Sequence, residues 1–212
     1  MIRRFGADTA LLIIDAQKGV NVLEHWGGPG ARRNNPEAEK RIGELLKAWR
    51  AAGRAVFYTA HDSREPDSPL KLSLPTGAFL PGLEPRAGEP VIEKDVNGGF
   101  IGTDLELRLR RANITRLVTV GFFTNMCVET TVRQGGNMGY DMYLVEDACA
   151  TTNRVGYDGS NYEAELVHAL SVASMHREFC TAIPARATLQ LLTQDDPGLQ
   201  KAPGNRSAAE LL

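Results

Sequence analysis

The sequence lacks any long hydrophobic run. Its apolar runs extend over about five to seven residues, whereas a helix that crosses a bilayer needs about 20. The first 17 residues contain two arginines, and their apolar run over 10–14 is short because Asp15 ends it. We therefore predict no membrane span and no signal peptide, and we interpret this segment as a first strand.

An excess of charge of one sign is also absent. The 24 lysine and arginine residues and the 26 aspartate and glutamate residues give a formal net charge of −2. Proteins that bind nucleic acid or an anionic membrane usually carry a basic surface, so we expect neither partner. Cysteine is scarce: Cys127, Cys149 and Cys180 are odd in number and widely spaced, which argues against a disulfide framework and indicates a reducing, cytoplasmic location.

Short apolar segments alternate with amphipathic segments along the chain. We predict strands over 10–14, 55–60, 91–92, 117–123, 141–145 and 180–183, and helices over 37–52, 103–111, 162–178, 187–192 and from about 125 onward. Such alternation predicts an α/β fold, a three-layer sandwich with a mostly parallel sheet and helices on both faces. No linker is visible, so we expect one domain over 1–212, with a core of about 9–192 and a loosely ordered or partner-dependent tail over 194–212.

Two helix predictions concern side chains. Glu129 and Arg133 lie four residues apart and should form an ion pair on the helix surface. The helix over 162–178 is expected to turn its apolar residues inward, namely Leu166, Ala169, Leu170, Ala173 and Met175.

Chemically active side chains cluster at predicted strand ends. Cys127 falls in the expected first turn of a helix that follows a buried strand, where the helix dipole would lower the pKa of its thiol. A buried structural cysteine is the alternative. Asp15, His61 and Lys94 also lie at or just after strand ends. Because the carboxyl ends of parallel strands share one edge, we expect these side chains to converge.

Asp15, Lys94 and Cys127 are the residue types that nucleophilic catalysis by a thiol requires. A cysteine nucleophile needs a proton acceptor and a nearby positive charge. Asp15 can accept the proton if a dry pocket raises its pKa, and Lys94 can supply the cation. Taken singly, Asp15 could be a turn or helix-cap residue and Lys94 an exposed loop lysine.

Three segments carry a resemblance to a known family. ALLIIDAQKG, IEKDVNGGFIGTDLELRLR and GFFTNMCVETTVRQGGNMGYDMYLVEDACAT resemble the isochorismatase-like cysteine hydrolase superfamily, over about residues 9–183. This resemblance implies a catalytic triad of Asp15, Lys94 and Cys127. It also implies a Rossmann-like sheet of about six strands.

The resemblance further implies an oxyanion hole and a reaction. A cis peptide bond between Phe122 and Phe123 would turn the N–H of Phe123 toward the site, beside the N–H of Cys127. Cys127 would attack the carbonyl of a small amide, carbamoyl or lactam substrate and form a thioester, with Asp15 moving the protons. Superfamily members that cleave the vinyl ether of isochorismate lack the cysteine, so its presence favours C–N cleavage.

The segment TAHDSREPDSPL departs from the pattern of nicotinamidases. Those enzymes carry an Asp-x-His metal motif after the second strand, whereas this chain has His61 and Ser63 there and no second histidine follows. Zinc sites normally use three or four protein ligands. We therefore predict no metal and no cofactor, and this departure argues against nicotinamidase activity.

Other segments, among them RRNNP, HDSREPDSPL and NGGFIGTDLE, resemble the metal-free subgroup close to streptothricin hydrolase. On this basis, we predict five substrate-binding residues: Trp26, Asn35, His61, Phe100 and Phe122. For Trp26 and Phe100, packing of loops against the core or against another subunit is the alternative. The resemblance also implies a homo-oligomer, either a dimer or a tetramer.

Three alternatives to an amidohydrolase stay open. They are a nicotinamidase-like enzyme, an ester or ether hydrolase on the same scaffold, and a non-catalytic oligomeric binding protein. Retention of Asp15, Lys94 and Cys127 weighs against the last of these. The substrate itself is not determined, because the residues that select it lie on loops that the sequence does not place.

Overall fold

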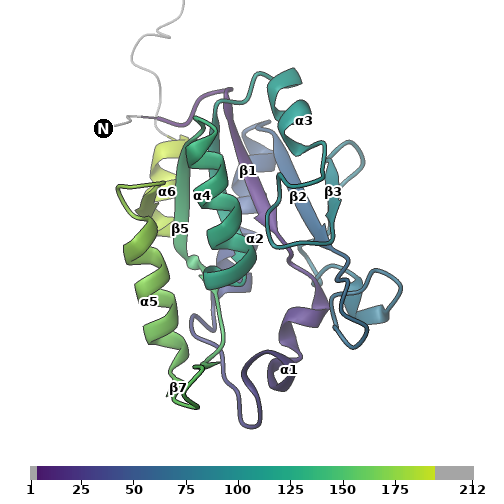
Figure 1. Cartoon of the computed structure of the whole chain (residues 1–212). Helices are drawn as coiled ribbons and strands as arrows, with labels where there is room; N and C mark the ends of the chain where they lie inside the picture. The colour runs from purple at the N-terminus through teal and green to yellow at the C-terminus, as the bar shows by residue number, and fades with distance from the viewer. Residues whose placement is uncertain (1–3, 194–212) are drawn as a thin grey trace, which may run out of the picture.

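The structure is a computed structural model of the 212-residue chain and describes residues 4–193 (Figure 1). The predicted tail over 194–212 lies outside the described residues. Among residues 4–193, no helix is long and apolar enough to cross a membrane.

Six strands form one sheet in the order β3-β2-β1-β4-β5-β8, and every neighbouring pair is parallel. Their bounds are Thr9–Ile14 for β1, Val56–His61 for β2, Val91–Lys94 for β3, Arg116–Phe122 for β4, Asp141–Ala150 for β5 and Thr181–Ile183 for β8. The first two strands are buried along their whole length, as continuous apolar runs in a covered parallel sheet require. This strand order is that of a Rossmann fold, so the predicted sheet is confirmed.

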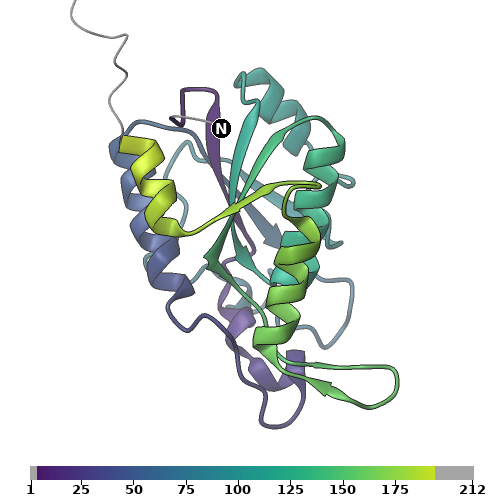
Figure 2. The same cartoon turned by 90° about the vertical axis from the view of Figure 1, so that its left-hand side faces the viewer.

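Helices cover both faces of the sheet, which confirms the three-layer sandwich (Figures 1 and 2). On one face, α2 (Ala38–Ala51) and α6 (Ala185–Thr193) pack against the side chains of β1 that include Leu11 and Ile13. The other face is covered by α3 (Leu105–Arg111), α4 (Glu129–Asn137) and α5 (Ala164–Met175). Both apolar layers therefore hold the strands in place from opposite sides.

The segment after β4 differs most from the sequence prediction. The predicted strand over 141–145 continues to Ala150, because Cys149 and Ala150 pair with Gly121 and Phe122 after a register shift in β4. Beyond it, residues expected to form a loop make a small antiparallel hairpin of β6 (Arg154–Val155) and β7 (Asn161–Tyr162). A short helix, α1 (Leu23–Gly27), likewise lies where no helix or strand is predicted.

The orientation of α5 also corrects the prediction. Of the residues predicted to face inward, Met175 is buried, but Leu166 and Leu170 are 46% and 59% exposed and Ala169 and Ala173 are also exposed. His168 is buried in their place. The helix is apolar around most of its circumference, so periodicity alone could not select the inward face. The ring nitrogen Nδ1 of His168 instead lies 2.9 Å from the Thr124 hydroxyl, next to the site described below.

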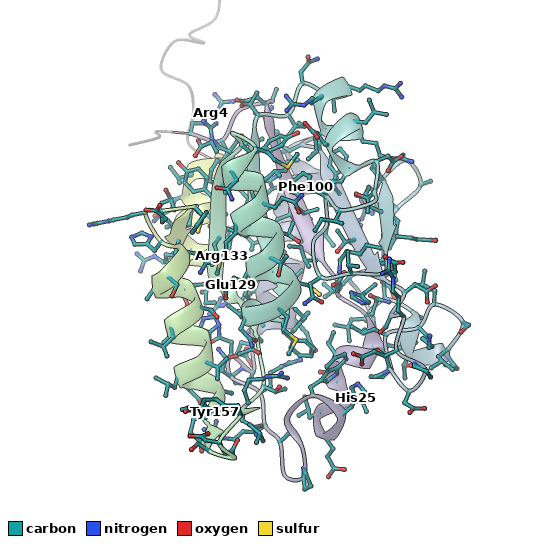
Figure 3. All side chains as sticks on the ribbon, in the orientation of Figure 1. Arg4, His25, Phe100, Glu129, Arg133 and Tyr157 are labelled. Atoms are coloured by element: carbon teal, nitrogen blue, oxygen red, sulfur yellow. The ribbon has the colours of Figure 1, made fainter. Side chains whose placement is uncertain are left out.

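On α4 the predicted ion pair is confirmed. The guanidinium of Arg133 lies 2.7 Å from the carboxylate of Glu129 on the same helix (Figure 3). This pair belongs to the helix surface and takes no part in the site.

Candidate active site

The candidate site lies at the carboxyl ends of four strands. Strand order reverses between β1 and β4, and ligands of open parallel sheets bind at such a switch point. Asp15 follows β1 directly, and His61 and Lys94 end β2 and β3 as partners in the strand register. Cys127 lies in a π-helical turn, Thr124–Val128, between β4 and α4.

Asp15 is buried and points into the sheet edge. Its φ angle of 51° lies in the left-handed region, which is uncommon for a residue other than glycine and turns the chain sharply out of β1. The carboxylate has no exposed surface. Its Oδ1 accepts a 2.6 Å hydrogen bond from the Thr59 hydroxyl, and its Oδ2 forms a 2.7 Å ion pair with the Lys94 ammonium.

The Lys94 ammonium forms an ion pair and has two hydrogen-bond acceptors. Its Nζ lies 2.7 Å from Asp15 Oδ2, 2.8 Å from His61 Nδ1 and 3.1 Å from the carbonyl oxygen of Val96. The Lys94 side chain has no exposed surface. A buried charge of this kind is tolerated because an opposite charge and hydrogen-bond acceptors replace water.

Cys127 places its sulfur above this ion pair. The Sγ atom lies 3.6 Å from His61 Nδ1 and 3.7 Å from Asn97 Oδ1, to which the thiol donates. The ligand atoms of Asp15, His61 and Cys127 all lie within 4.8 Å of one another. Side chains from distant chain segments therefore meet at one point, as the strand-end positions predicted.

The electrostatics of the site differ from the prediction. Burial raises the pKa of the Cys127 thiol, the Asp15 carboxylate raises it further, and Lys94 offsets only part of the increase. Burial also tends to raise the pKa of Asp15, but the Lys94 ammonium holds this pKa well below its usual range. Burial alone would lower the pKa of Lys94, but Asp15 raises it overall. The resting site therefore contains a neutral thiol beside an ionised Asp–Lys pair.

Backbone geometry at the end of β4 agrees with the resemblance. The peptide bond between Phe122 and Phe123 is cis, as predicted. At Gly121 the φ angle is 129°, and a Cβ atom there would overlap the carbonyl oxygen of Ile14. Glycine therefore allows β4 to approach β1 closely beneath the site.

A cavity of about 410 Å³ opens above the sulfur, within the range of small-molecule sites. Its walls come from α1, the segment after β2, the loop after β3, the π-helical turn and β6. The lining residues are His25, Trp26, His61, Ser63, Arg64, Glu65, Ser68, Leu70, Asp95, Asn97, Phe123, Met126, Cys127 and Arg154. Asp15 and Lys94 do not line the cavity, because both side chains lie fully buried beneath it.

Two predicted substrate-binding residues, Trp26 and His61, do line this cavity. The indole of Trp26 donates a 2.9 Å hydrogen bond to the carbonyl oxygen of Gly19 and packs on Phe123 with ring centroids 4.9 Å apart. Its position is therefore fixed both by the 3-10 turn Lys18–Asn21, which contains Gly19, and by Phe123 next to the π-helical turn.

Asn35 does not line the cavity, which corrects its prediction as a substrate-binding residue. Its Nδ2 donates to the carbonyl oxygens of Glu146 at 3.0 Å and Cys149 at 2.7 Å. These two bonds use both amide hydrogens and tie the segment before α2 to β5. Asn35 thus has a structural role.

Phe100 and Phe122 are also absent from the cavity wall. Phe100 stacks on Tyr140 with ring centroids 5.8 Å apart, and Figure 3 shows it well away from His25. Phe122 is 1% exposed and packs in the core under the guanidinium of Arg33. Packing against the core, the alternative kept open for Phe100, is what the structure shows.

The chemistry of the donor set does not suit a resident metal ion. Asp15, His61 and Cys127 could in principle bind a cation together. The ammonium of Lys94 already lies 2.7 Å from the carboxylate and 2.8 Å from the imidazole. A metal ion placed among these ligands would have to displace a buried ammonium whose pKa is raised.

Sequence reasoning missed four residues of the site. Thr59, which orients the Asp15 carboxylate, lies two residues before His61 and therefore on the same face of β2. Asn97 stands in the quoted NGGF segment, three residues after Lys94. Gln17, whose amide bonds to the backbone of His61, stands in the quoted ALLIIDAQKG segment. Arg154, which lines the cavity, gave no signal, because a hairpin arginine has no characteristic spacing.

The fold and the site define a Rossmann-type α/β protein with an aspartate, a lysine and a cysteine at the carboxyl edge of its sheet. Residues 9–178 match the family described as the isochorismatase domain. The chain therefore belongs to the isochorismatase family of hydrolases.

Individual relatives agree with this assignment. The isochorismatase-family protein YrdC of Bacillus subtilis (strain 168) is 38% identical, with 82% of this chain and 90% of YrdC aligned. The ureidoacrylate amidohydrolase RutB of Acinetobacter baylyi is 43% identical, with 66% of this chain and 70% of RutB aligned. A crystal structure of an isochorismatase-family protein from Chromobacterium violaceum has a TM-score of 0.83 at 40% identity, covering 90% of this chain and 97% of that chain.

Proposed function

We propose that the protein is a cysteine amidohydrolase that cleaves a C–N bond of a small amide, carbamoyl or lactam substrate. The observation that carries this proposal is the placement of the Cys127 thiol at the floor of a small cavity, directly above the Asp15–Lys94 ion pair. A thiol with a buried proton acceptor and a fixed cation has the groups that acyl transfer needs.

In the first step Cys127 Sγ forms a bond with the carbonyl carbon and its proton passes to Asp15. Before the reaction the thiol holds its proton and the carboxylate is ionised, so donor and acceptor are in the protonation states that this step needs. The raised pKa of the thiol and the lowered pKa of Asp15 make the transfer unfavourable by itself, so we propose that it occurs together with formation of the C–S bond. The N–H groups of Phe123 and Cys127 are proposed to bind the oxyanion. Lys94 offsets the negative charge that builds up on the sulfur.

In the second half of the reaction the C–N bond breaks and Asp15 returns its proton to the leaving amine. The acyl group then remains on Cys127 as a thioester. A water molecule gives a proton to Asp15 and attacks the thioester, which breaks the C–S bond. The sulfur takes the proton back, so the site regains its resting state.

One observation favours cleavage of C–N bonds over cleavage of ester or ether bonds. RutB, a relative at 43% identity, is named an amidohydrolase that acts on ureidoacrylate. A nicotinamidase-like activity is less well supported, because His61 and Ser63 stand where nicotinamidases carry their Asp-x-His metal motif. We also propose that the protein belongs to the subgroup close to streptothricin hydrolase. This assignment is based on the segments RRNNP, HDSREPDSPL and NGGFIGTDLE.

The test is a panel of small amides, ureido acids and carbamoyl amino acids, assayed for released ammonia. The wild-type chain should release ammonia from at least one compound, and the Cys127→Ala variant from none. Turnover by this variant at the wild-type rate would contradict the proposed nucleophile. Hydrolysis of esters alone would favour the alternative ester hydrolase.

The proposal of a cytoplasmic homo-oligomer, a dimer or a tetramer, rests on the family resemblance. The exposed apolar side chains of Leu166 and Leu170 on α5 support it, because neighbouring apolar residues on one helix are typical of contact surfaces. Light scattering of the full chain in solution gives its mass directly. A mass equal to that of one chain would contradict the proposal.

A further inference from the structure

His61 occupies a fixed position beside the ion pair. Its backbone N–H donates to Gln17 Oε1 at 2.8 Å, and its carbonyl oxygen accepts from Gln17 Nε2 at 3.1 Å. The same amide also reaches the carbonyl oxygen of Gly77 at 3.0 Å, and Gln17 is fully buried. Only 9% of the His61 side chain is exposed, so its ring has little freedom to move.

The contact between His61 and Lys94 fixes the state of the ring. An ammonium group has no lone pair, so Lys94 donates and His61 Nδ1 accepts in their 2.8 Å contact. Nδ1 therefore carries no proton, and the proton of the neutral ring is on Nε2.

The same contact decides which group accepts the proton of the thiol. Cys127 Sγ lies 3.6 Å from His61 Nδ1, a separation that would suit a cysteine–histidine pair. Because the lone pair of Nδ1 is engaged by Lys94, this nitrogen is not free to accept a proton. Asp15 remains as the acceptor, and the role of His61 must be a different one.

The second ring nitrogen faces the cavity. Within residues 4–193, no hydrogen-bond partner is found for His61 Nε2, and this atom does not belong to the buried polar atoms without a partner. His61 lines the cavity, so the accessible part of its ring is turned toward it. The Nε2–H group is thus available to a molecule bound above Cys127.

We infer that His61 is a positioning residue for Lys94 and also a hydrogen-bond donor to the substrate. Through Nδ1 it fixes one ammonium hydrogen and holds Lys94 between the Asp15 carboxylate and the Cys127 sulfur. Through Nε2–H it selects a substrate with a carbonyl or carboxylate oxygen next to the scissile amide. This inference rests on the proposed amidohydrolase function.

Two substitutions separate these roles. In His61→Asn the side-chain oxygen stands as many bonds from the backbone as Nδ1 does, so it can accept from Lys94. In His61→Gln the amide group extends to the place of Nε2, so the donor to the substrate is kept and the acceptor for Lys94 is lost. Both variants are polar and no larger than about the size of histidine. Since each keeps one of the two interactions and loses the other, each serves as the control for the other.

The first readout needs no substrate. Alkylation of Cys127 by iodoacetamide at pH 7 is followed by peptide mass spectrometry. His61→Asn should react within about threefold of the wild-type rate, and His61→Gln on the order of 10- to 100-fold more slowly, as is typical when a group that orients a functional residue is lost. Cys149 is fully buried, so its labelling would reveal a variant that has unfolded.

The second readout is the division between kcat and KM on an amide from the panel. His61→Asn should raise KM about 10-fold with little change in kcat, and His61→Gln should lower kcat with little change in KM. A merely structural residue would give the same loss in both variants. Equal losses, or two variants that behave as the wild type does, would overturn the inference.

Failure of the inference and failure of the proposed function give different results. If the wild-type chain turns over no amide of the panel, both proposals are wrong. If the wild-type chain hydrolyses an amide, but the two variants do not differ in labelling or in kinetics, only the role of His61 is wrong.

Discussion

The inner and outer ends of the site are built in different ways: the inner end lies at and beneath the floor of the cavity, and the outer end surrounds its entrance. At the inner end, Asp15, His61 and Lys94 come from adjacent strand ends, and their side chains are at most 9% exposed. At the outer end, Arg64 lies on a loop with 71% of its side chain exposed and pairs with Asp95. The sheet therefore fixes the chemistry, while loops that can vary independently shape the entrance.

The two ends also differ in what their charges contribute. The Asp15–Lys94 pair is fully buried, so each partner depends on the other to offset the loss of water. The Arg64–Asp95 pair is screened by solvent and contributes little to stability. Substitutions at the inner end should therefore change both folding and turnover, whereas substitutions at the outer end should mainly change binding.

The largest expected effect follows from Cys127→Ala. Amide turnover should fall on the order of 10⁴-fold or more, because no other group of the site can form the acyl intermediate. The fold should persist, since the ion pair beneath the sulfur is untouched. Ammonia release and the thermal unfolding midpoint measure the two effects, and Cys127→Ser serves as a control of nearly equal volume. Turnover by the alanine variant near the wild-type rate would show that a residue other than Cys127 is the nucleophile.

Asp15→Asn should damage both folding and catalysis. It leaves the Lys94 ammonium buried without its counter-charge, which typically costs about 3–5 kcal/mol of unfolding free energy. The pKa of the Cys127 thiol should fall, because the carboxylate that raises it is gone. Turnover should nevertheless be lost, since no group then returns a proton to the leaving amine.

Urea unfolding of Asp15→Asn and of the double variant Asp15→Asn/Lys94→Met checks this interpretation. The double variant should recover much of the lost stability while it stays inactive, because no unpaired charge remains buried. Equal stability of the wild-type chain and Asp15→Asn would show that the buried Asp15–Lys94 pair contributes no more to stability than the exposed Arg64–Asp95 pair does.

The pH dependence should be flat over a wide range. The lowered pKa of Asp15 adds stability that is present above the unfolded aspartate value of about 3.9 and lost as pH falls through the folded value. The raised pKa of Lys94 adds stability that is present below about 10.4 and lost as pH rises through its folded value. The stability difference between the wild-type chain and the double variant Asp15→Asn/Lys94→Met, in which neither position titrates, should therefore stay constant between roughly pH 5 and 9.

Urea unfolding of both proteins across this range measures that difference. A decline that begins near pH 6, well above the unfolded value, would contradict an aspartate whose pKa is lowered by Lys94.

The smallest effect is expected at the outer end. Trp26→Ala removes the ring that packs on Phe123 in the cavity wall, so KM should rise about 10-fold while kcat stays nearly constant. Trp26→Phe keeps an aromatic ring and loses only the hydrogen bond to Gly19, so it should lie between the alanine variant and the wild-type chain. Steady-state kinetics on one amide distinguishes them. A large fall in kcat would show that Trp26 contributes to the chemical step and not only to substrate binding.

This division explains how much the sequence could predict. Asp15, Lys94 and Cys127 were placed together because strands with clear apolar patterns end beside them, and parallel strand ends share an edge. Asn35 and Phe100 were misplaced because they lie on connecting segments, where contacts are made with distant backbone and core groups.

Protonation was harder to predict than position. The helix N-terminus suggested a lowered thiol pKa, but Cys127 lies in a π-helical turn, and burial together with Asp15 outweighs the attraction of Lys94. These opposing contributions depend on burial and on distances of a few ångströms, which no sequence pattern specifies. The sequence likewise could not specify which face of α5 is buried, because this helix is apolar on nearly every side.

The most direct test of the account is a search for the acyl-enzyme itself. The wild-type chain is mixed with an amide that it hydrolyses, quenched with acid within the first turnovers and analysed by intact-protein and peptide mass spectrometry. The account predicts a transient mass increase equal to the acyl group, carried by the peptide that contains Cys127 and absent in Cys127→Ala. Hydrolysis without any adduct on that peptide under conditions of rapid acylation, or an adduct on another residue, would contradict it.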